Sequence, residues 1–402
     1  MSHGDQPAVS TALVNIGTLL TGDVGTPYGD ADALRIDDGV ITAIGDVDPS
    51  DVERVIDVDG ATVAPGLIDS HCHVVLGDYT PRQRAVGFLE SYVHGGITQV
   101  ISPGEIHLPG RPHDAAGVKA LAVIAQRSWA NYRPGGMKVN GGAIVLEPVL
   151  TPEDFAEVAA AGVWLAKFGF GTYTDPADGL PQVRAAQDVG IKVMAHSGGA
   201  SIPGSLPITT EHLLLLRPDV CGHVNGGPTS LDEDGLDRII RTTDLVLQLV
   251  QAGNLHSALR IVDTVREVGA ERRVIIGSDT PTGTGVMPLG VLKTVAEITS
   301  LGGVDPGLVW AWASGATADV YGLAAGKVEV GRPADLVVCD APWGSLGADA
   351  TAALRRGDVP GISAVLIDGE VRALTSRNTP AAARPVRVTP HMEDPCGSEH
   401  VC

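Results

Sequence analysis

The stretch Ala64-Pro65-Gly66-Leu67-Ile68-Asp69-Ser70-His71-Cys72-His73-Val74 decides how the rest of the chain is interpreted. It is an apolar run that follows a Pro-Gly pair and ends in two histidines two positions apart. Because side chains alternate along a β-strand, His71 and His73 should lie on one face and Cys72 on the other. Two neighbouring imidazoles at a strand end are suited to bind a metal ion. The alternative is a surface strand with incidental histidines, so the interpretation depends on finding further ligands.

This strand is the first of eight apolar segments that alternate with amphipathic helical patterns through the middle of the chain. The predicted strands cover residues 67–74, 97–102, 138–146, 163–168, 191–196, 219–223, 244–250 and 273–279. Such alternation is typical of a parallel sheet with crossover helices. The sequence therefore predicts an α/β fold, a (β/α)₈ TIM barrel with its active site at the carboxyl ends of the strands. A doubly wound open sheet is the alternative.

Both ends of the chain instead contain short strands joined by turn signals. Hairpin patterns surround Asp37-Asp38-Gly39 and Asp368-Gly369, and residues 334–340 read as a further strand. We therefore predict a small β-sandwich assembled from both chain ends. The predicted units are 1–63 for its first part, 64–325 for the barrel, 326–375 for its second part and 376–402 for a proline-containing tail or arm.

The overall composition limits the partners that the protein can have. The chain has 28 Lys and Arg against 48 Asp and Glu, a formal net charge of −20 that argues against binding to a phosphate backbone. No run approaches the roughly 18 apolar residues of a membrane span, and the first residues lack the pattern of a secretory signal. Five scattered cysteines do not favour a disulfide framework. We therefore expect a cytoplasmic protein that binds neither nucleic acid nor membrane.

Five of the predicted barrel strands end in side chains that could take part in a metal site. These side chains are His71 and His73, Lys167, His196, His223 and Asp279. Since the carboxyl ends of barrel strands meet at one rim, all six should gather there. A single buried histidine is more often a hydrogen-bonded core residue, and a single aspartate is more often a helix cap. Six such residues at matching strand ends predict a metal centre.

These residues also carry a resemblance to a known family. The motif Pro65-Gly66-Leu67-Ile68-Asp69-x-His71-x-His73, the later ligands and the β-rich chain ends resemble the amidohydrolase superfamily over nearly the full length. Loop segments such as Ser201-Ile202-Pro203-Gly204-Ser205 and His223-Val224-Asn225-Gly226-Gly227-Pro228-Thr229 are most similar to the enamidase subfamily. The resemblance implies a homotetramer that hydrolyses a C–N amide bond in a small cyclic enamide, such as 6-oxo-1,4,5,6-tetrahydronicotinate.

The resemblance further implies a binuclear centre with two divalent metal ions, either zinc, a zinc–iron pair or manganese. His71, His73 and Asp279 would hold one ion, and His196 and His223 would hold the other. The implied chemistry is metal-assisted hydrolysis in which Asp279 acts first as general base and then as general acid.

At one position the chain departs from the enamidase subfamily, which has a bridging glutamate where this sequence has Lys167. An ammonium group cannot bind a metal ion, but a lysine carboxylated by carbon dioxide carries two oxygens that can. Burial in a cationic site favours the neutral amine that reacts with carbon dioxide. We therefore expect Lys167 to be carboxylated and to bridge the two ions. The alternative is a pocket base or surface charge beside a single ion.

The substrate is less strongly predicted than the chemistry. A carboxylated ring needs a cationic anchor, and Arg111 is the first candidate because guanidinium binds carboxylate in a bidentate manner. Arg82 and His107 are the next candidates, and Tyr79 and Asn225 are further pocket candidates. A loop-bracing salt bridge is the alternative role for Arg111. The same scaffold would also suit a linear acyl-amino-acid or dipeptide hydrolase, a metal-dependent deaminase or a non-catalytic scaffold protein.

Overall fold

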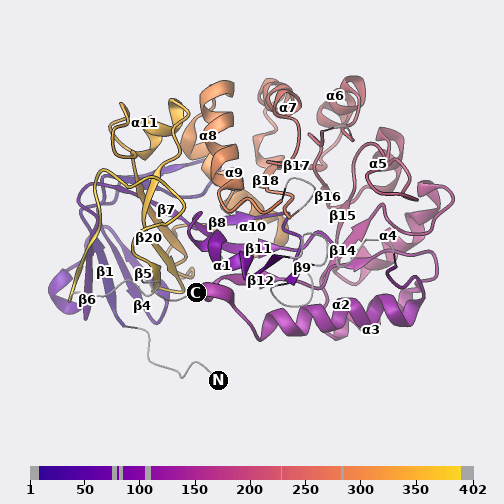
Figure 1. The fold of residues 1–402 in the computed structure, drawn as a ribbon, viewed down its shortest axis with the longest axis horizontal. Coiled ribbons are helices and arrows are strands. Elements are labelled where there is room, and N and C mark those ends of the chain that lie inside the picture. Colours follow the sequence, from indigo (N-terminus) through magenta and orange to yellow (C-terminus); the bar gives the residue numbers. More distant parts are fainter. Residues whose placement is uncertain are drawn as a thin grey trace.

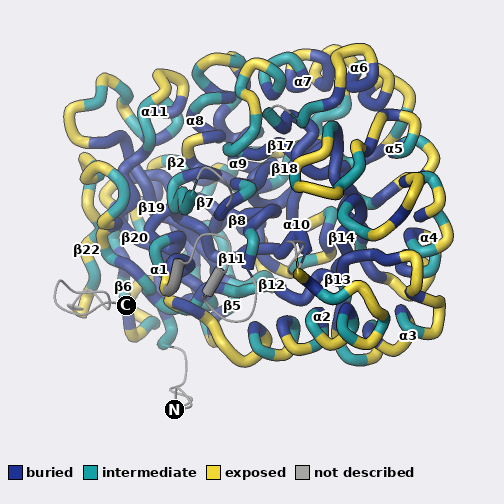
Figure 2. The backbone as a smooth tube through the Cα atoms, turned by 45° about the vertical axis from the view of Figure 1, so that its right-hand side comes forward, coloured by how far each residue is buried: buried dark blue, intermediate teal, exposed yellow. Residues whose placement is uncertain are grey.

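The computed structural model describes residues 9–74, 79–80, 85–104, 110–227, 229–281 and 285–390, with the backbone alone at 79–80 and 85–86. The molecule has two parts (Figure 1). Sheets built from the chain ends lie on one side, and a closed ring of strands surrounded by helices lies on the other. Strands of the ring are buried while the outer faces of its helices are exposed (Figure 2). In the described part of the chain, no helix has the length and apolar character needed to cross a bilayer.

Eight parallel staves form the ring at the positions that the sequence predicts, where a stave is one barrel strand or the broken pair β12 and β13. They are β8 (Leu67–Asp69), β11 (Ile97–Ile101), β12 (Lys138–Asn140) with β13 (Ile144–Val145), β14 (Leu165–Phe168), β15 (Lys192–Ala195), β16 (Val220–Cys221), β17 (Val246–Val250) and β18 (Val274–Gly277). Hydrogen bonds join β12-β11-β8 and β13-β14-β15-β16-β17-β18 in these orders. The predicted strand 138–146 is interrupted because Gly142 adopts a left-handed conformation, with φ of +87°. The predicted TIM barrel is thus confirmed.

The ring closes where β18 meets β8, and this seam carries the first predicted ligands. Ser70 N donates to Ile276 O at 3.3 Å, and Asp279 N donates to His71 O at 2.8 Å. Gly277 permits this approach, since a Cβ at this position would lie 2.7 Å from the Cβ of His71. The first and last staves therefore bring their carboxyl ends into direct contact.

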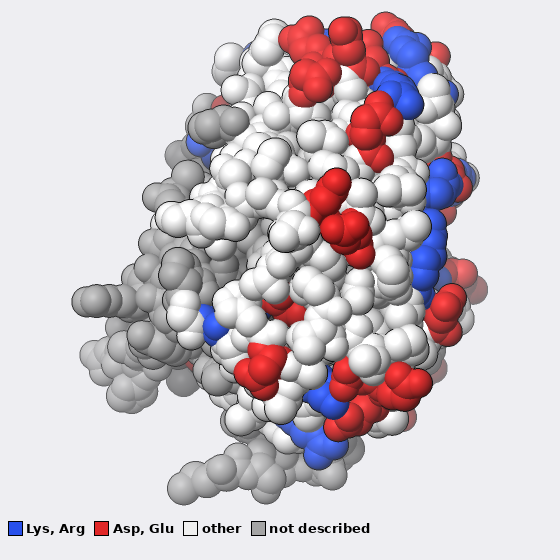
Figure 3. All heavy atoms as spheres, turned by 90° about the vertical axis from the view of Figure 1, so that its right-hand side faces the viewer, with Lys and Arg blue, Asp and Glu red and all other residues white. Residues whose placement is uncertain are grey.

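The helices cover the outside of the barrel and extend towards the end sheets. They are α1 (Phe88–Val93), α2 (Ala115–Ala130), α3 (Pro152–Ala160), α4 (Leu180–Asp188), α5 (Thr210–Leu216), α6 (Glu233–Thr242), α7 (Leu255–Glu267), α8 (Gly290–Gly302), α9 (Pro306–Trp312), α10 (Gly315–Tyr321) and α11 (Ala350–Arg355). Helix α3 shows how the sequence starts them: Thr151 and Asp154 cap each other's backbone N–H, and Pro152 occupies the first helical position. Ion pairs such as Arg217–Asp244 join neighbouring segments at the surface, where basic and acidic side chains lie beside each other (Figure 3).

Two further sheets are built from both chain ends. Their strands are β1 (Thr11–Val14), β2 (Thr18–Leu20), β3 (Tyr28–Gly29), β4 (Leu34–Asp37), β5 (Val40–Ile44), β6 (Arg54–Asp57), β7 (Thr62–Pro65), β19 (Leu336–Asp340), β20 (Gly361–Ile367), β21 (Glu370–Ala373) and β22 (Arg387–Thr389). The sheet orders are β22-β6-β1-β4-β5 and β21-β20-β19-β7-β2-β3, and a small β9 (Tyr79–Thr80) and β10 (Ala85–Val86) hairpin is separate. Side chains from both sheets, such as Leu34 and Leu336, share one apolar core.

Part of the predicted tail contributes to these sheets. Strand β22 pairs antiparallel with β6, and the Arg384 guanidinium donates to both carboxylate oxygens of the fully buried Asp340, at 2.6 and 2.7 Å. Residues 376–390 are therefore fixed on their own chain by a strand pairing and by an ion pair to a buried carboxylate. Residues 391–402 lie outside the described part of the structure.

The end sheets and the barrel are connected directly at Gly66. Strand β7 ends at Pro65 and β8 begins at Leu67, so one residue separates the two units. A side chain at Gly66 would be 2.2 Å from Thr98 Oγ1, and Trp310 Nε1 donates to Pro65 O at 2.9 Å. The Pro-Gly pair of the opening motif thus lies in a tightly packed junction.

Candidate metal centre

Three of the predicted ligands meet at the seam between β8 and β18. Asp279 Oδ1 lies 3.2 Å from His71 Nε2 and 3.0 Å from His73 Nε2. The possible ligand atoms of these three residues all lie within 4.8 Å of one another. The burial of Asp279 would raise the pKa of its carboxyl, but the two histidines outweigh burial and hold that pKa well below its usual value. An ionised carboxylate beside two imidazoles is a suitable donor set for a divalent ion.

Asp69 and Ser278 hold this seam together from within. Asp69 accepts hydrogen bonds from His71 N at 3.0 Å, Ser278 N at 2.8 Å and Ser278 Oγ at 2.5 Å. Burial raises the pKa of Asp69 to about 6, although these hydrogen bonds oppose the rise. Ser278 directly precedes Asp279 and Asp69 lies two positions before His71, and this proximity in sequence to predicted ligands was the signal that could have identified them.

The second pair of predicted histidines lies across the same rim. His196 Nδ1 faces His223 Nε2 at 3.1 Å, and the His223 ring centroid is 5.5 Å from that of His71. His196 Nε2 contacts Gly199 O at 2.6 Å, and since a carbonyl can only accept, the imidazole hydrogen is assigned to Nε2. Burial, together with the charge of Lys167, lowers the pKa of His196 to about 4 and that of His223 well below its usual value. Both rings are therefore neutral and can bind a metal ion.

Lys167 is buried beside these histidines. Its side chain is about 1% exposed, and Nζ lies 3.8 Å from Met194 Sδ and 5.7 Å from the centre of the Phe170 ring. The Phe170 ring in turn contacts the His196 ring edge-on, with 5.3 Å between centroids. Burial lowers the pKa of the Lys167 amine to about 8, although Asp279 opposes the shift. Among the described residues, no carboxylate is hydrogen-bonded to this amine.

The backbone at two of these positions is strained. His223 has φ of +38° and Asp279 has φ of +57°, in the left-handed region that residues other than glycine rarely adopt. Strain of this kind persists where the surrounding structure enforces it, and it is concentrated at functional sites. The strain therefore marks two of the six predicted residues, His223 after β16 and Asp279 after β18, as positions that the surrounding structure holds in place.

Arg111, the first candidate for the substrate anchor, is engaged elsewhere. Its guanidinium donates to Pro112 O at 3.0 Å, to Phe170 O at 2.6 Å and to the carboxylate of Glu147. Glu147 is fully buried and also accepts from Thr172 N at 2.8 Å and Thr172 Oγ1 at 2.7 Å. This geometry favours the bracing alternative, in which Arg111 and Glu147 fix the loop after β14. Sequence reasoning missed Glu147, although it directly follows a predicted strand.

Replacing Arg111 with methionine should lower the free energy of unfolding by about 3–5 kcal/mol, because it leaves the buried Glu147 carboxylate without its cation. Urea-induced unfolding followed by tryptophan fluorescence measures this change. The exposed Arg127 on α2 offers a matched control, and R127M should unfold like the wild type. A variant R111M with unchanged stability and a strongly raised KM would instead restore the anchor role.

The Glu147 cluster should also shape the acid stability of the protein. Burial raises the pKa of Glu147, but hydrogen bonds from Thr172, His113 and Arg111 outweigh it and leave the pKa below its usual value. Such a carboxylate stabilises the fold above the unfolded-state pKa of about 4.3, and this contribution is lost as the pH falls through the lowered folded-state value. The difference in unfolding temperature between wild type and E147Q should therefore become smaller below about pH 4.3. Thermal unfolding at a series of pH values measures it. A difference that is constant between neutral and acidic pH would contradict this assignment.

Of the other candidates for the substrate pocket, the structure describes the side chain of Asn225 alone. Asn225 is buried and pairs with the backbone of Val250, donating to its carbonyl at 3.0 Å and accepting from its N–H at 2.8 Å. This pairing occupies both ends of its amide and favours a bracing role. Arg82 and His107 lie outside the described residues, and the structure describes only the backbone of Tyr79.

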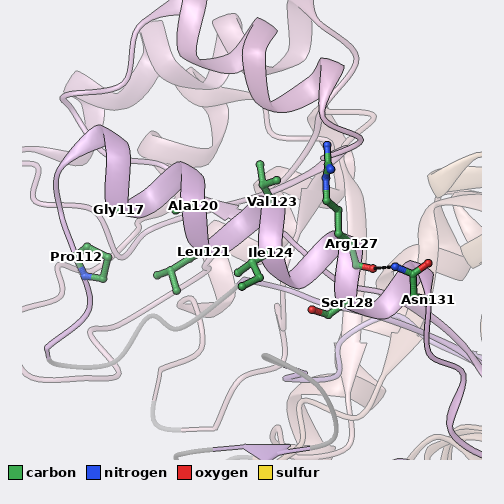
Figure 4. A pocket seen from close by; sticks show the side chains of 9 residues that line it. All are labelled: Pro112, Gly117, Ala120, Leu121, Val123, Ile124, Arg127, Ser128 and Asn131. Carbon is green, nitrogen blue, oxygen red and sulfur yellow. Dashed lines mark hydrogen bonds between the residues drawn. The ribbon is translucent and has the colours of Figure 1, made fainter.

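A separate groove of about 770 Å³ lies along the outer face of α2. Apolar side chains such as Leu121 and the half-exposed Ile124 line it, and none of the six predicted ligands is among them (Figure 4). It therefore belongs to the outer surface of the barrel.

This chain is similar in sequence and in structure to proteins of the amidohydrolase family. The sequence profile of the amidohydrolase family matches residues 246–372. Enamidase of Eubacterium barkeri is 45% identical over 383 residues, which cover 94% of this chain and 99% of that protein. An adenine deaminase of Bacillus velezensis is 25% identical over 312 residues, which cover 76% of this chain and 50% of that protein. The crystal structure of an enamidase superposes with a TM-score of 0.91 at 45% identity and covers 94% of this chain and 100% of that one.

Proposed function

Because this chain belongs to the amidohydrolase family, we propose that it hydrolyses the C–N bond of a cyclic enamide such as 6-oxo-1,4,5,6-tetrahydronicotinate. The observation that carries this proposal is the 45% identity to an enamidase over 94% of the chain and 99% of that protein. The substrate would be a small molecule whose ring amide is opened by water.

The proposed centre holds two divalent metal ions. His71, His73 and Asp279 would bind one ion, and His196 and His223 would bind the other, with Lys167 between them. The donor set fits, because His71, His73 and the ionised carboxylate of Asp279 lie together, and the neutral imidazoles of His196 and His223 face each other nearby. When bound, such ions lower the pKa of water and polarise an amide carbonyl. Zinc, a zinc–iron pair and manganese are all compatible with these donors.

Asp279 is proposed to move the proton in this reaction. Its carboxylate would accept a proton from the attacking water as the oxygen bonds to the carbonyl carbon. It would then deliver the same proton to the ring nitrogen as the C–N bond breaks. The ring opens to a carboxylate and an enamine with release of the second proton of the water, and water is the only co-reactant.

Lys167 is proposed to be carboxylated on Nζ. Burial favours its neutral amine, whose lone pair can bond to the carbon of carbon dioxide with loss of one proton. The resulting carbamate carries one negative charge and two oxygens, which a buried ammonium lacks. This proposal explains why a fully buried lysine lies among histidines without a hydrogen-bonded carboxylate among the described residues.

A carboxylated substrate also requires a cation. Since the guanidinium of Arg111 is held by Glu147 and Phe170, Arg82 and His107 are the remaining candidates for this role. The homotetramer that the resemblance implies and the cytoplasmic location that the composition indicates stay predictions.

The test is turnover on a panel that contains the cyclic enamide, simple lactams, hydantoins, acyl-amino acids and adenine, combined with metal analysis of the purified protein. We expect ring opening of the cyclic enamide and two bound ions per chain. Turnover confined to acyl-amino acids would identify a linear-amide hydrolase, and ammonia release from adenine would identify a deaminase. Either result would overturn the proposed substrate.

A further inference from the structure

Gln248 is the polar residue in the middle of β17, in the apolar sequence Val246-Leu247-Gln248-Leu249-Val250. Its side chain is fully buried and reaches across the inside of the barrel to the end of β8. A leucine there would avoid the cost of burying an amide, which is offset only when the amide is fully hydrogen-bonded. No sequence pattern signals a role for this residue.

The contacts of Gln248 fix the orientation of its amide. Oε1 accepts from the backbone N–H of His223 at 3.2 Å, and Nε2 donates to Ser70 O and Ser70 Oγ, both at 2.9 Å. The Ser70 hydroxyl in turn donates to Ile276 O at 2.8 Å. Turning the amide over would set Nε2 against the N–H of His223 and Oε1 against the carbonyl of Ser70. Only the observed orientation pairs each donor with an acceptor.

This orientation determines the state of His71. Gln248 Oε1 lies 2.6 Å from His71 Nδ1, and an amide oxygen can only accept a hydrogen bond. Nδ1 of His71 must therefore carry a hydrogen, so that the lone pair of the neutral ring is the one on Nε2. That atom faces Asp279 Oδ1 at 3.2 Å, and a cation bound by both atoms would satisfy both.

We propose that Gln248 is a positioning residue that holds the Nδ1–H tautomer and ring plane of His71, so that Nε2 is presented to a divalent ion. Because the same oxygen accepts from His223 N, Gln248 also ties a ligand of each proposed ion to one amide. The inference rests on the proposed metal centre, and it adds a residue that fixes the ligands without touching the ion. Partners of this kind commonly change metal affinity about 10–100-fold when they are removed.

The test compares zinc affinity, measured by competition with a chromophoric chelator, in the wild type and in Q248M, which keeps the volume and removes the acceptor. We expect Q248M to bind zinc about 10–100-fold more weakly. The control is Q251M, three residues along the chain, because Gln251 contacts Thr294 and Glu297 on α8 and none of the proposed ligands. Zinc affinity of Q251M should equal that of the wild type. Thermal unfolding of each protein in EDTA separates lost affinity from lost stability.

Folded Q248M with wild-type zinc affinity would overturn the inference. If Q248M does not fold, NMR of the metal-free wild type labelled with [¹⁵N]histidine decides, since His71 must show its hydrogen on Nδ1 and an Nε2 tautomer would contradict the proposal. The outcomes for the two proposals differ. A wild type that binds zinc but opens no cyclic enamide overturns the substrate while leaving the role of Gln248 testable. A wild type that binds no divalent ion of zinc, iron or manganese overturns both proposals.

Discussion

Replacing Asp279 with asparagine should lower kcat for the cyclic enamide by about 10²–10⁴-fold, the range for loss of a general acid–base group. Asparagine keeps the shape and one oxygen of aspartate, but it cannot accept the proton of the attacking water or return it to the ring nitrogen. Steady-state kinetics should be accompanied by metal analysis of each preparation. The expected result is a slow enzyme at saturating substrate, even in those molecules that retain their metal ions.

The control for this variant is D263N, since Asp263 is exposed on α7 and is not one of the proposed ligands. It should turn over like the wild type. A fully metal-loaded D279N with wild-type kcat would remove Asp279 from the proton transfer and with it the proposed mechanism.

Replacing Lys167 with glutamine should reduce the metal content from two ions towards one per chain and lower kcat by about 10²–10³-fold. The expected size reflects the several kcal/mol that one ion contributes to charge stabilisation, at 1.4 kcal/mol for each factor of ten. Glutamine is neutral and similar in reach, but it cannot form a carbamate. The measurements are metal analysis and kinetics on the same samples.

K167E is the matched comparison, because glutamate places a carboxylate where the carbamate is proposed. It should retain two ions and recover most of the turnover that K167Q loses. Added propionate should partly rescue a truncated K167A for the same reason. Two ions and wild-type turnover in K167Q would show that Lys167 does not bridge the ions.

The barrel was predictable because its signals are local. Apolar runs bounded by turns mark each strand, and parallel staves must place their carboxyl ends at one rim. From this rule alone, His71, His196 and Asp279 could be expected to meet. The glycine break within 138–146 was less evident, since it depends on how Gly142 packs against α2.

Residues whose role depends on a distant partner could not be predicted in this way. Arg111 is surrounded by loop sequence, and only the folded chain shows that Glu147 and Phe170 O occupy its guanidinium. Gln248 is a single polar residue in an apolar strand, and its partner His71 is 177 positions away. The position of residues 376–390 was likewise not predictable from the sequence, because the pairing of Arg384 with Asp340 depends on packing rather than on a local pattern.

The single-residue link at Gly66 has a consequence for how this enzyme can be divided or evolved. Strand β7 is hydrogen-bonded to β19 from the far end of the chain, with Pro65 opposite Leu336, and the stave that leads to His71 starts immediately after it. The terminal sheets therefore determine where along the barrel axis strand β8 begins, and so where His71 and His73 lie at the rim. Exchange of this region for that of a relative should displace the ligands unless the junction is transplanted with it, so a functional chimera should require both sides of Gly66 from the same parent.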